Sequence, residues 1–261
     1  MKIILSRKGF DSANGGCASP ILEDGTLLSM PIPVDAESPC KYEDLYYNGV
    51  SYLSLLSQIK HNFTDRYCHL DPDIRKDCMK RSSNWQPLFG QCGAAQTHLR
   101  NNNVGSGDIF LFFGLFRRTI KHSDGTLHFT GPNMQIIFGY FQIGDVIEGE
   151  KIKQYHWHPH SRPAYYKKVN NCLYVPSNTL IFNQSLPGCG ILSYDNKRVL
   201  TKPQYAETRW NLPEFFKEVS ITYHNKESFH ANYFQSVSRG QEFIVSEDIR
   251  VTQWAKNIIC D

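Results

Sequence analysis

The chain has 261 residues, of which 41% are hydrophobic and 13% aromatic, enough to bury a substantial core in one large domain or two small ones. Only 20% of the residues are charged, and the formal net charge is +3. This balance excludes a histone-like or polybasic protein, because non-specific binding to duplex DNA needs a denser positive face. Paired cations at residues 117–118, 167–168 and 197–198 still allow a local basic groove.

No targeting or membrane segment is evident. Only residues 3–5 are apolar before Ser6, far fewer than the hydrophobic region of a signal peptide, and no run approaches the ~18 apolar residues that span a bilayer. The eight cysteines are scattered without a Cys-x-x-Cys pair, which argues against zinc-finger and redox motifs. We therefore expect buried, reduced thiols in a soluble cytoplasmic protein without a membrane partner.

The first half of the chain alternates between strand and helix signals. An apolar strand is expected over residues 2–5, and Asp-Gly between apolar runs predicts a hairpin around residues 21–28. Apolar residues at helical spacing predict a helix over residues 42–60. Asp71-Pro72-Asp73 fits a helix start with Pro at the first helical position, and the small residues 93–95 are expected to open one or two helical turns.

Two long apolar runs dominate the second half. Residues 108–116 predict a central strand buried on both faces, and residues 135–147 predict a second, longer strand. The other expectations are a loop or edge from Tyr155, short strands at 173–175, 179–182 and 198–201, a short helix from Trp210, a strand at 240–245, and a closing helix at 246–258 capped by Ser246. These elements predict one α+β domain over residues 1–261, with a strand-rich mixed sheet or a partly closed barrel and flanking helices.

The segment after the first strand carries far more polar chemistry than a turn requires. Arg7, Lys8, Asp11 and Ser12 follow the strand directly, and the pair Gly15-Gly16 comes next. Fixed cations, a carboxylate and hydroxyls at the end of a buried strand suit an anionic or polar ligand. The alternative for the glycine pair is a plain loop that demands positive φ angles.

Each of these side chains has a functional and a structural interpretation. Arg7 and Lys8 could neutralise a phosphate or a developing oxyanion, or they could be solvated charges at a strand end. Asp11 could orient Arg7, act as a general base, or cap a turn with its side chain. Asp11 and Ser12 are our predicted catalytic residues in this segment, and Arg7 and Lys8 are predicted to bind substrate.

Three histidines stand at alternate positions, at residues 156, 158 and 160. In a strand they would share one face, a spacing that can bind Zn²⁺. Pro159 interrupts a regular strand, however, and no nearby carboxylate or cysteine completes a site. We therefore predict no metal site and interpret the segment as a histidine-rich surface or substrate loop. If one of these histidines acts as a general acid or base, His158 or His160 is the candidate, and His158 is our predicted catalytic residue.

Further candidates come from the middle and the tail of the chain. Gln91, Gln96 and His98 lie on the short Gly-Ala segment, and an amide that donates and accepts together suits the edge of a nucleobase; the alternative is that they satisfy backbone groups at a helix end. Arg239, Gln241 and Glu242 precede the last strand and could complete the pocket from the C-terminal side, with Arg239 and Gln241 predicted to bind substrate. The alternative for Arg239 and Glu242 is a surface ion pair that contributes little. Cys92 fits a buried thiol better than a nucleophile.

A set of motifs occurs along the chain in one order: SRKGFDSANGGCASPI at 6–21, FGQCGAAQTHL at 89–99, VGSGDIFLFFGLFR at 104–117, His-Pro-His at 158–160, Asn-Cys-Leu-Tyr-Val-Pro at 171–176 and RGQEFIV at 239–245. Together they resemble the third type of nucleotide-modification-associated domain, over nearly the whole chain. That family is associated by genome context with enzymes that modify DNA bases, largely in phages and bacteria. The two long strands also resemble, more weakly, those of PUA-like barrels, which bind nucleobases or RNA.

The resemblance implies an enzyme that modifies a DNA base or nucleotide, with nucleotide or DNA as substrate and other DNA-modification proteins as possible partners. The alternatives are a non-catalytic PUA-like reader of modified bases, an accessory subunit, or a structural or inhibitory interaction protein. No Walker, Rossmann or S-adenosylmethionine-type glycine motif is evident. We therefore predict no dinucleotide cofactor, and the sequence identifies no other cofactor.

Overall fold

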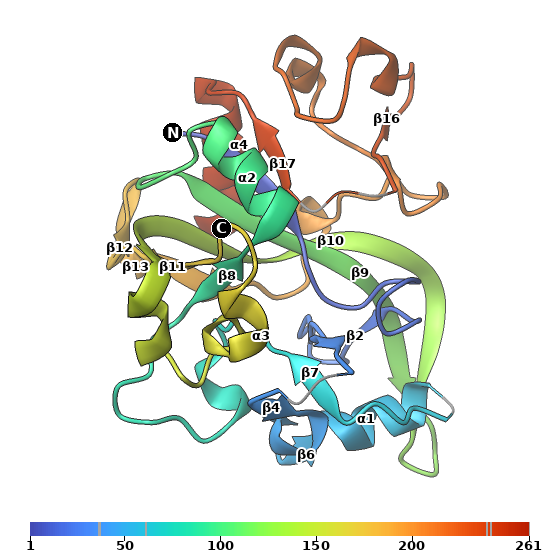
Figure 1. Ribbon diagram of the computed structural model, residues 1–261. Helices are drawn as coiled ribbons and strands as arrows, with labels where there is room; N and C mark the ends of the chain where they lie inside the picture. Colours follow the sequence, from blue (N-terminus) through green and yellow to red (C-terminus); the bar gives the residue numbers. More distant parts are fainter. Residues whose placement is uncertain (36–37, 61, 239, 241, 261) are drawn as a thin grey trace.

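The computed structural model describes residues 1–35, 38–60, 62–238, 240 and 242–260, and its main feature is a curled mixed sheet (Figure 1). The strands follow the order β17-β1-β9-β10-β11-β8, while β2 pairs with β9 and β14 pairs with β10. Their bounds are β1 Ile3–Arg7, β2 Ser19–Ile21, β8 Phe89–Gln91, β9 Ile109–Lys121, β10 Leu127–Glu148, β11 Cys172–Pro176, β14 Cys189–Ile191 and β17 Glu242–Val245.

The two longest strands, β9 and β10, build the curl. They pair antiparallel along nearly their whole length, with register shifts between Thr130 and Met134 and between Ile137 and Gly139. Such irregularities bend a strand and increase its twist, so the sheet closes into a half-barrel. The predicted α+β class with a strand-rich, partly closed mixed sheet is confirmed, as are the two long central strands.

The central strands are buried on both faces, which explains their continuous apolar sequence. On one face Ile3, Leu111 and Phe113 pack with helix α4 (Ile249–Cys260). On the other face Phe110 and Phe112 belong to a second cluster of aromatic side chains. Because successive side chains of a strand point to opposite faces, the run of phenylalanines supplies both cores.

Helix α4 begins three residues later than the sequence predicts. Asp248, rather than Ser246, accepts the backbone N–H of Arg250 at 2.8 Å with its side chain. The Ser246 hydroxyl instead accepts the N–H of Ser220 at 3.1 Å. The cap prediction was wrong because a carboxylate two residues further along serves the first turn of the helix.

The expected helix over residues 42–60 is interrupted. A hairpin of β5 (Tyr46–Tyr47) and β6 (Val50–Ser51) precedes helix α1 (Tyr52–Ile59). Asn48 and Gly49 both adopt positive φ angles, of 47° and 79°, and Asn-Gly is the preferred pair for such a two-residue hairpin turn. This local turn preference overrides the helical spacing of the apolar residues.

The chain from Asp71 to residue 82 also departs from the prediction. It has no regular secondary structure at Asp71 and forms only a short 3-10 helix, η2 (Lys76–Cys78). The preceding strand β7 (Tyr67–His69) pairs with β3 (Ile32–Pro33) and β4 (Cys40–Lys41) in a small separate sheet. Asp71 therefore does not cap a helix, and its carboxylate is available for other contacts.

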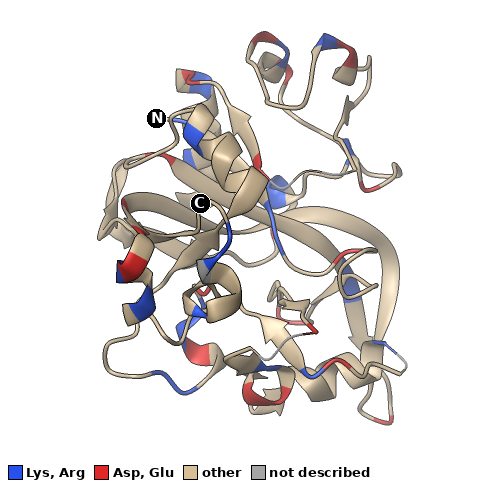
Figure 2. Cartoon of the chain, in the orientation of Figure 1, with Lys and Arg blue, Asp and Glu red and all other residues tan. Residues whose placement is uncertain are grey.

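The remaining elements are short: α2 Gly93–Asn101, α3 Pro163–Tyr166, β12 Thr179–Leu180, β13 Asn183–Pro187, β15 Arg209–Trp210, β16 Phe234–Gln235, and the 3-10 helices η1 Tyr42–Asp44, η3 Gly149–Gln154, η4 Pro159–Ser161, η5 Asn196–Arg198, η6 Glu214–Glu218 and η7 Lys226–Ser228. Lys, Arg, Asp and Glu are interspersed, mainly on loops and helices (Figure 2). None of the helices in the described ranges is long and apolar enough to cross a bilayer.

Candidate functional site

A cavity of about 450 Å³ opens where β1 ends. The loop after β1, the end of β7, strand β8 and helix η4 contribute its walls. Its lining residues are Arg7, Lys8, Gly9, Asp11, Ala13, Asn14, Ile32, His69, Asp71, Gly90, Gln91, His160, Ser238 and Gly240. A volume of this size is typical of sites for small molecules and cofactors. The cavity is thus lined by four residues that the sequence predicts for the site: Arg7, Lys8, Asp11 and Gln91.

A buried polar cluster of Lys8, Gln91 and Glu242 supports one side of the cavity. Glu242 is 2% exposed, and its Oε1 accepts from Lys8 Nζ at 3.0 Å and from Gln91 Nε2 at 2.7 Å. The Lys8 ammonium also lies 4.5 Å from the centre of the Phe89 ring. A carboxylate this deeply buried is tolerated only when it is paired and hydrogen-bonded, so Glu242 holds both neighbours at the cavity wall.

Arg7 uses much of its hydrogen-bonding capacity inside the fold. Its Nη1 donates to the carbonyl of Ser238 at 2.6 Å, and its Nη2 donates to that of Val237 at 2.9 Å. Burial lowers the pKa of Arg7, and the nearby Asp11 opposes this shift. Arg7 therefore fastens the segment at 237–238 to the rim of the cavity, which is a structural task in addition to any contact with a ligand.

Asp11 closes the turn that follows the first strand. Its Oδ1 accepts the N–H groups of Ala13 at 2.8 Å and of Asn14 at 2.7 Å, which is the turn-capping alternative that the sequence allows. Gly15 has a φ of +82°, and a Cβ there would meet the Phe10 ring at 2.4 Å. Ser12 is exposed and is not among the residues that line the cavity.

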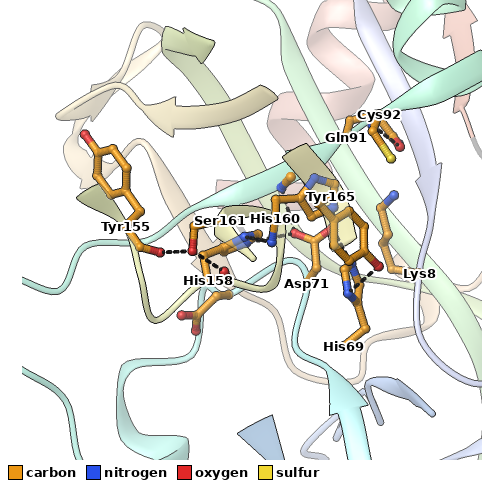
Figure 3. A network of polar contacts seen from close by, with 12 residues as sticks. Lys8, His69, Asp71, Gln91, Cys92, Tyr155, His158, His160, Ser161 and Tyr165 are labelled. Carbon is orange, nitrogen blue, oxygen red and sulfur yellow. Dashed lines mark hydrogen bonds and ion pairs between the residues drawn. The ribbon is translucent and has the colours of Figure 1, made fainter. Parts of the chain in front are cut away.

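The opposite wall holds a cluster of histidines around one carboxylate (Figure 3). Asp71 Oδ2 lies 3.8 Å from His69 Nε2 and 3.9 Å from His160 Nε2, and Asp71 Oδ1 lies 3.3 Å from His158 Nε2. The N–H of Gly90 donates to Asp71 Oδ1 at 2.7 Å. The Asp71 side chain is only 5% exposed, so the cluster forms a desolvated polar wall.

Hydrogen bonds on the outer side of the rings orient the histidines. Asn171 Nδ2 donates to the carbonyl of His160 at 3.0 Å, which leaves Asn171 Oδ1 to accept from His160 Nδ1 at 2.7 Å. The His160 ring thus carries its proton on Nδ1, and Nε2 turns a lone pair toward Asp71. On the other side of the cluster, Tyr165 Oη lies 3.1 Å from His69 Nδ1.

His158 stands behind Asp71 and away from the cavity. It is fully buried, and its Nδ1 accepts the backbone N–H of His160 at 3.2 Å. Because Nδ1 is an acceptor, a proton of this ring sits on Nε2, which lies 3.3 Å from Asp71 Oδ1. The expectation of a histidine-rich surface loop was wrong for His158 and His160, which are both buried, whereas His156 is exposed.

Burial and charge set the protonation states of the cluster. Burial alone would raise the pKa of Asp71, but its contacts with His158 and His69 outweigh this effect and hold the pKa well below its usual range. Burial lowers the pKa of His160 to about 3, although Asp71 acts in the opposite direction. At neutral pH the cavity is therefore lined by an ionised carboxylate and a neutral imidazole.

Other predicted site residues lie elsewhere. Gln96 is buried, and its Oε1 accepts from the Tyr174 hydroxyl at 2.8 Å. His98 Nε2 lies 3.1 Å from Thr222 Oγ1, and its ring packs beside Tyr223. Neither is among the residues that line the cavity. The predicted substrate-binding residues Arg239 and Gln241 lie outside the described residues.

The cysteines are unpaired and largely shielded from solvent. All eight are free thiols, and each is buried or half-buried. Burial raises the pKa of Cys92, while Lys168 opposes the shift. A thiol with a raised pKa is a poor nucleophile, although Cys92 is half-buried rather than buried as expected.

His69 and Asp71 are the functional candidates that the sequence analysis missed. They stand two residues apart, His69 as the last residue of β7 and Asp71 just beyond it, and His-x-Asp at the end of a strand was the available signal. The interpretation of Asp71 as a helix start concealed it. Their partner His160 follows 89 positions after Asp71 (160 − 71), and only the fold brings the two together.

Comparison with known proteins gives one match. The family model described as nucleotide modification associated domain 3 matches residues 2–246, which confirms the resemblance inferred from the motifs. No curated protein and no solved structure matches the chain. The weaker resemblance to PUA-like barrels therefore stays a prediction.

Proposed function

Because the chain belongs to the family of nucleotide modification associated domain 3, we propose that it is an enzyme that binds a nucleotide or a nucleobase of DNA in the cavity at the end of β1 and modifies the base there. The observation that carries this proposal is that two chemically different walls face one cavity of about 450 Å³. One wall suits recognition of a polar, planar ligand, and the other suits proton transfer or activation of a reacting group.

The recognition wall is formed by Lys8 and Gln91, which Glu242 holds from behind. Lys8 uses one N–H on Glu242, and an ammonium group has three to offer. The Gln91 amide both donates to Glu242 and accepts the N–H of Cys92 at 3.1 Å, which fixes its plane. A nucleobase edge alternates donors and acceptors, so preset polar groups of this kind can select one base over another.

The reactive wall is formed by Asp71 and His160. A neutral imidazole and an ionised carboxylate that share one cavity can accept a proton from a bound water or from the base itself. His158 contacts Asp71 from the buried side, so we assign it a positioning role rather than a catalytic one. Asp11 keeps a place on the cavity wall, whereas the exposed Ser12 has no contact that supports the predicted catalytic role.

The test combines binding with product analysis. The purified protein is titrated with nucleosides, nucleotides and single-stranded DNA, and nucleosides from the DNA of cells with and without the protein are compared by mass spectrometry. We expect Gln91→Leu to weaken ligand binding at least tenfold and Asp71→Asn to abolish the modified nucleoside while ligand binding persists. Gln253→Leu, an exposed glutamine on α4, is the matched control and should behave as wild type.

Three outcomes distinguish the alternatives. A modified nucleoside that depends on Asp71 supports the enzyme. Salt-sensitive binding of DNA with an unchanged nucleoside profile supports the reader of modified bases instead. No binding to any member of the panel, with a folded protein, contradicts both and favours an interaction protein.

A further inference from the structure

Three side chains in the cavity wall offer ligand atoms to a common point. One nitrogen each of His69 and His160 and one carboxylate oxygen of Asp71 lie within 4.8 Å of one another. The two distances to Asp71 Oδ2, 3.8 Å and 3.9 Å, exceed the range of a direct hydrogen bond. Ligands at about 2.1 Å from a metal ion lie roughly 3.0–3.5 Å apart. The two contacts with Asp71 would have to shorten by less than about 1 Å, and a separation of 4.8 Å by about 1.3–1.8 Å, to place all three atoms around one cation.

The outer contacts of the cluster match those of known metal ligands. A histidine that binds a metal with one ring nitrogen usually donates its other N–H to a carbonyl, amide or carboxylate, which fixes the tautomer. His160 has such a bond from Nδ1 to Asn171 at 2.7 Å, and Tyr165 Oη faces His69 Nδ1 at 3.1 Å. Asp71 uses Oδ1 for the N–H of Gly90, so Oδ2 is turned to the two histidines.

The backbone of β8 lies close to the histidine rings because position 90 has no side chain. A Cβ at position 90 would lie 2.5 Å from the ring of His160 and 2.8 Å from that of His158. Glycine is therefore required in β8 for the histidines to approach Asp71. This close packing restricts the position of the His160 ring, one of the three groups that offer a ligand atom.

We propose that His69, Asp71 and His160 bind one divalent transition-metal ion on the wall of the cavity. Two imidazoles and one carboxylate suit Zn²⁺, Fe²⁺, Co²⁺ or Mn²⁺ better than the all-oxygen preference of Ca²⁺ and Mg²⁺. Three protein ligands leave further coordination positions, and these face the cavity, where a water or a substrate atom can occupy them. This inference goes beyond the proposed function, because metal binding is measured without any substrate. With an ion bound, Asp71 and His160 would serve as its ligands, and the ion rather than these side chains would activate a bound water.

The first experiment measures metal content and affinity directly. Wild-type protein is stripped with a chelator and titrated with Co²⁺ and Zn²⁺ by calorimetry, with Co²⁺ absorption as a second readout. We expect one ion per chain, and we expect His69→Ala, Asp71→Asn and His160→Ala each to lose at least 100-fold in affinity. His156→Ala is the matched control, since this exposed histidine belongs to the same alternating set and should bind as wild type does.

A second variant separates loss of a ligand from loss of the fold. Asn171→Ala removes the acceptor of His160 Nδ1 but no ligand atom, and we expect metal affinity to fall 10- to 100-fold while circular dichroism is unchanged. Thermal melts with and without Zn²⁺ provide a further readout, because an ion that binds only the folded state raises its melting temperature.

Clear results would overturn the proposal. Wild-type protein that binds no ion at millimolar concentration contradicts it, as does an equal loss in His156→Ala and His160→Ala. If metal binding fails while nucleotides still bind in the cavity, the proposed function stands without the metal. If metal binds and no nucleotide does, the metal site stands and the proposed substrate is wrong.

Discussion

Two segments of the molecule, residues 6–16 and residues 155–171, supply polar groups to the same cavity in opposite ways. The first is rich in charges, yet Arg7 and Asp11 use much of their bonding capacity on the neighbouring backbone. The second carries as many charged side chains, spread over a longer segment, but His160 is held by its outer nitrogen and keeps the inner one for the cavity. The comparison teaches that a site depends less on how many polar groups a segment has than on which of their atoms the fold leaves unused.

The largest expected effect separates Asp71 from Asp11. Asp71→Ala leaves the N–H of Gly90 and the surrounding histidines without their common partner, so we expect a loss of about 3 kcal/mol in unfolding free energy. Asp11→Ala removes only turn bonds and should cost about 1 kcal/mol. Urea unfolding of both variants provides the measurement. Equal losses would remove the distinction between the first segment and the cluster that His158 and His160 of the second segment form with Asp71.

The buried pair of Lys8 and Glu242 should come next. Lys8→Met leaves the Glu242 carboxylate buried beside Gln91 alone, and we expect a cost of about 2–3 kcal/mol. The double variant Lys8→Met/Glu242→Gln removes the unpaired charge and should recover at least half of that loss. Strict additivity of the two single variants in a double-mutant cycle would show that the pair is not coupled.

A substitution at Gly90 tests the packing around His160 of the second segment. Gly90→Ala introduces a methyl group 2.5 Å from the His160 ring, and we expect a loss of about 1–2 kcal/mol from overpacking. Gly105→Ala is the matched control, because a Cβ there meets nothing within 4 Å. Thermal melts compare the two, and a Gly90 variant as stable as the control would mean that the histidines have room to spare.

The smallest expected effect is a pH dependence at His224. Burial lowers the pKa of His224, with Thr222 opposing, and its Nε2 accepts the N–H of Val237. Below its ordinary pKa near 6.5 the unfolded chain takes up this proton while the folded chain does not, so the contribution to stability falls as the pH drops below about 6.5 and levels off below the folded pKa. His224→Gln should lose part of this slope in unfolding at pH 5–8, and an unchanged slope would contradict the assignment.

The sequence predicted the fold better than the site. A long apolar run such as residues 108–116 is typical of a strand buried on both faces, so the central strands of the sheet could be predicted. Interruption of the 42–60 helix was missed because the Asn48-Gly49 turn signal is local and short. The N-terminal wall was predicted because its residues are consecutive, whereas His69, Asp71 and His160 are joined only by the tertiary structure.

The position of β1 has a consequence for how the protein folds. This strand pairs with β9 in parallel and with β17 in antiparallel register, and Ile3 lies opposite Val245. The residues that pair here are 242 positions apart (245 − 3). Contacts at such sequence separation slow folding, so we expect the pairing of β1 with β17, which brings Glu242 to Lys8, to be a slow step of folding.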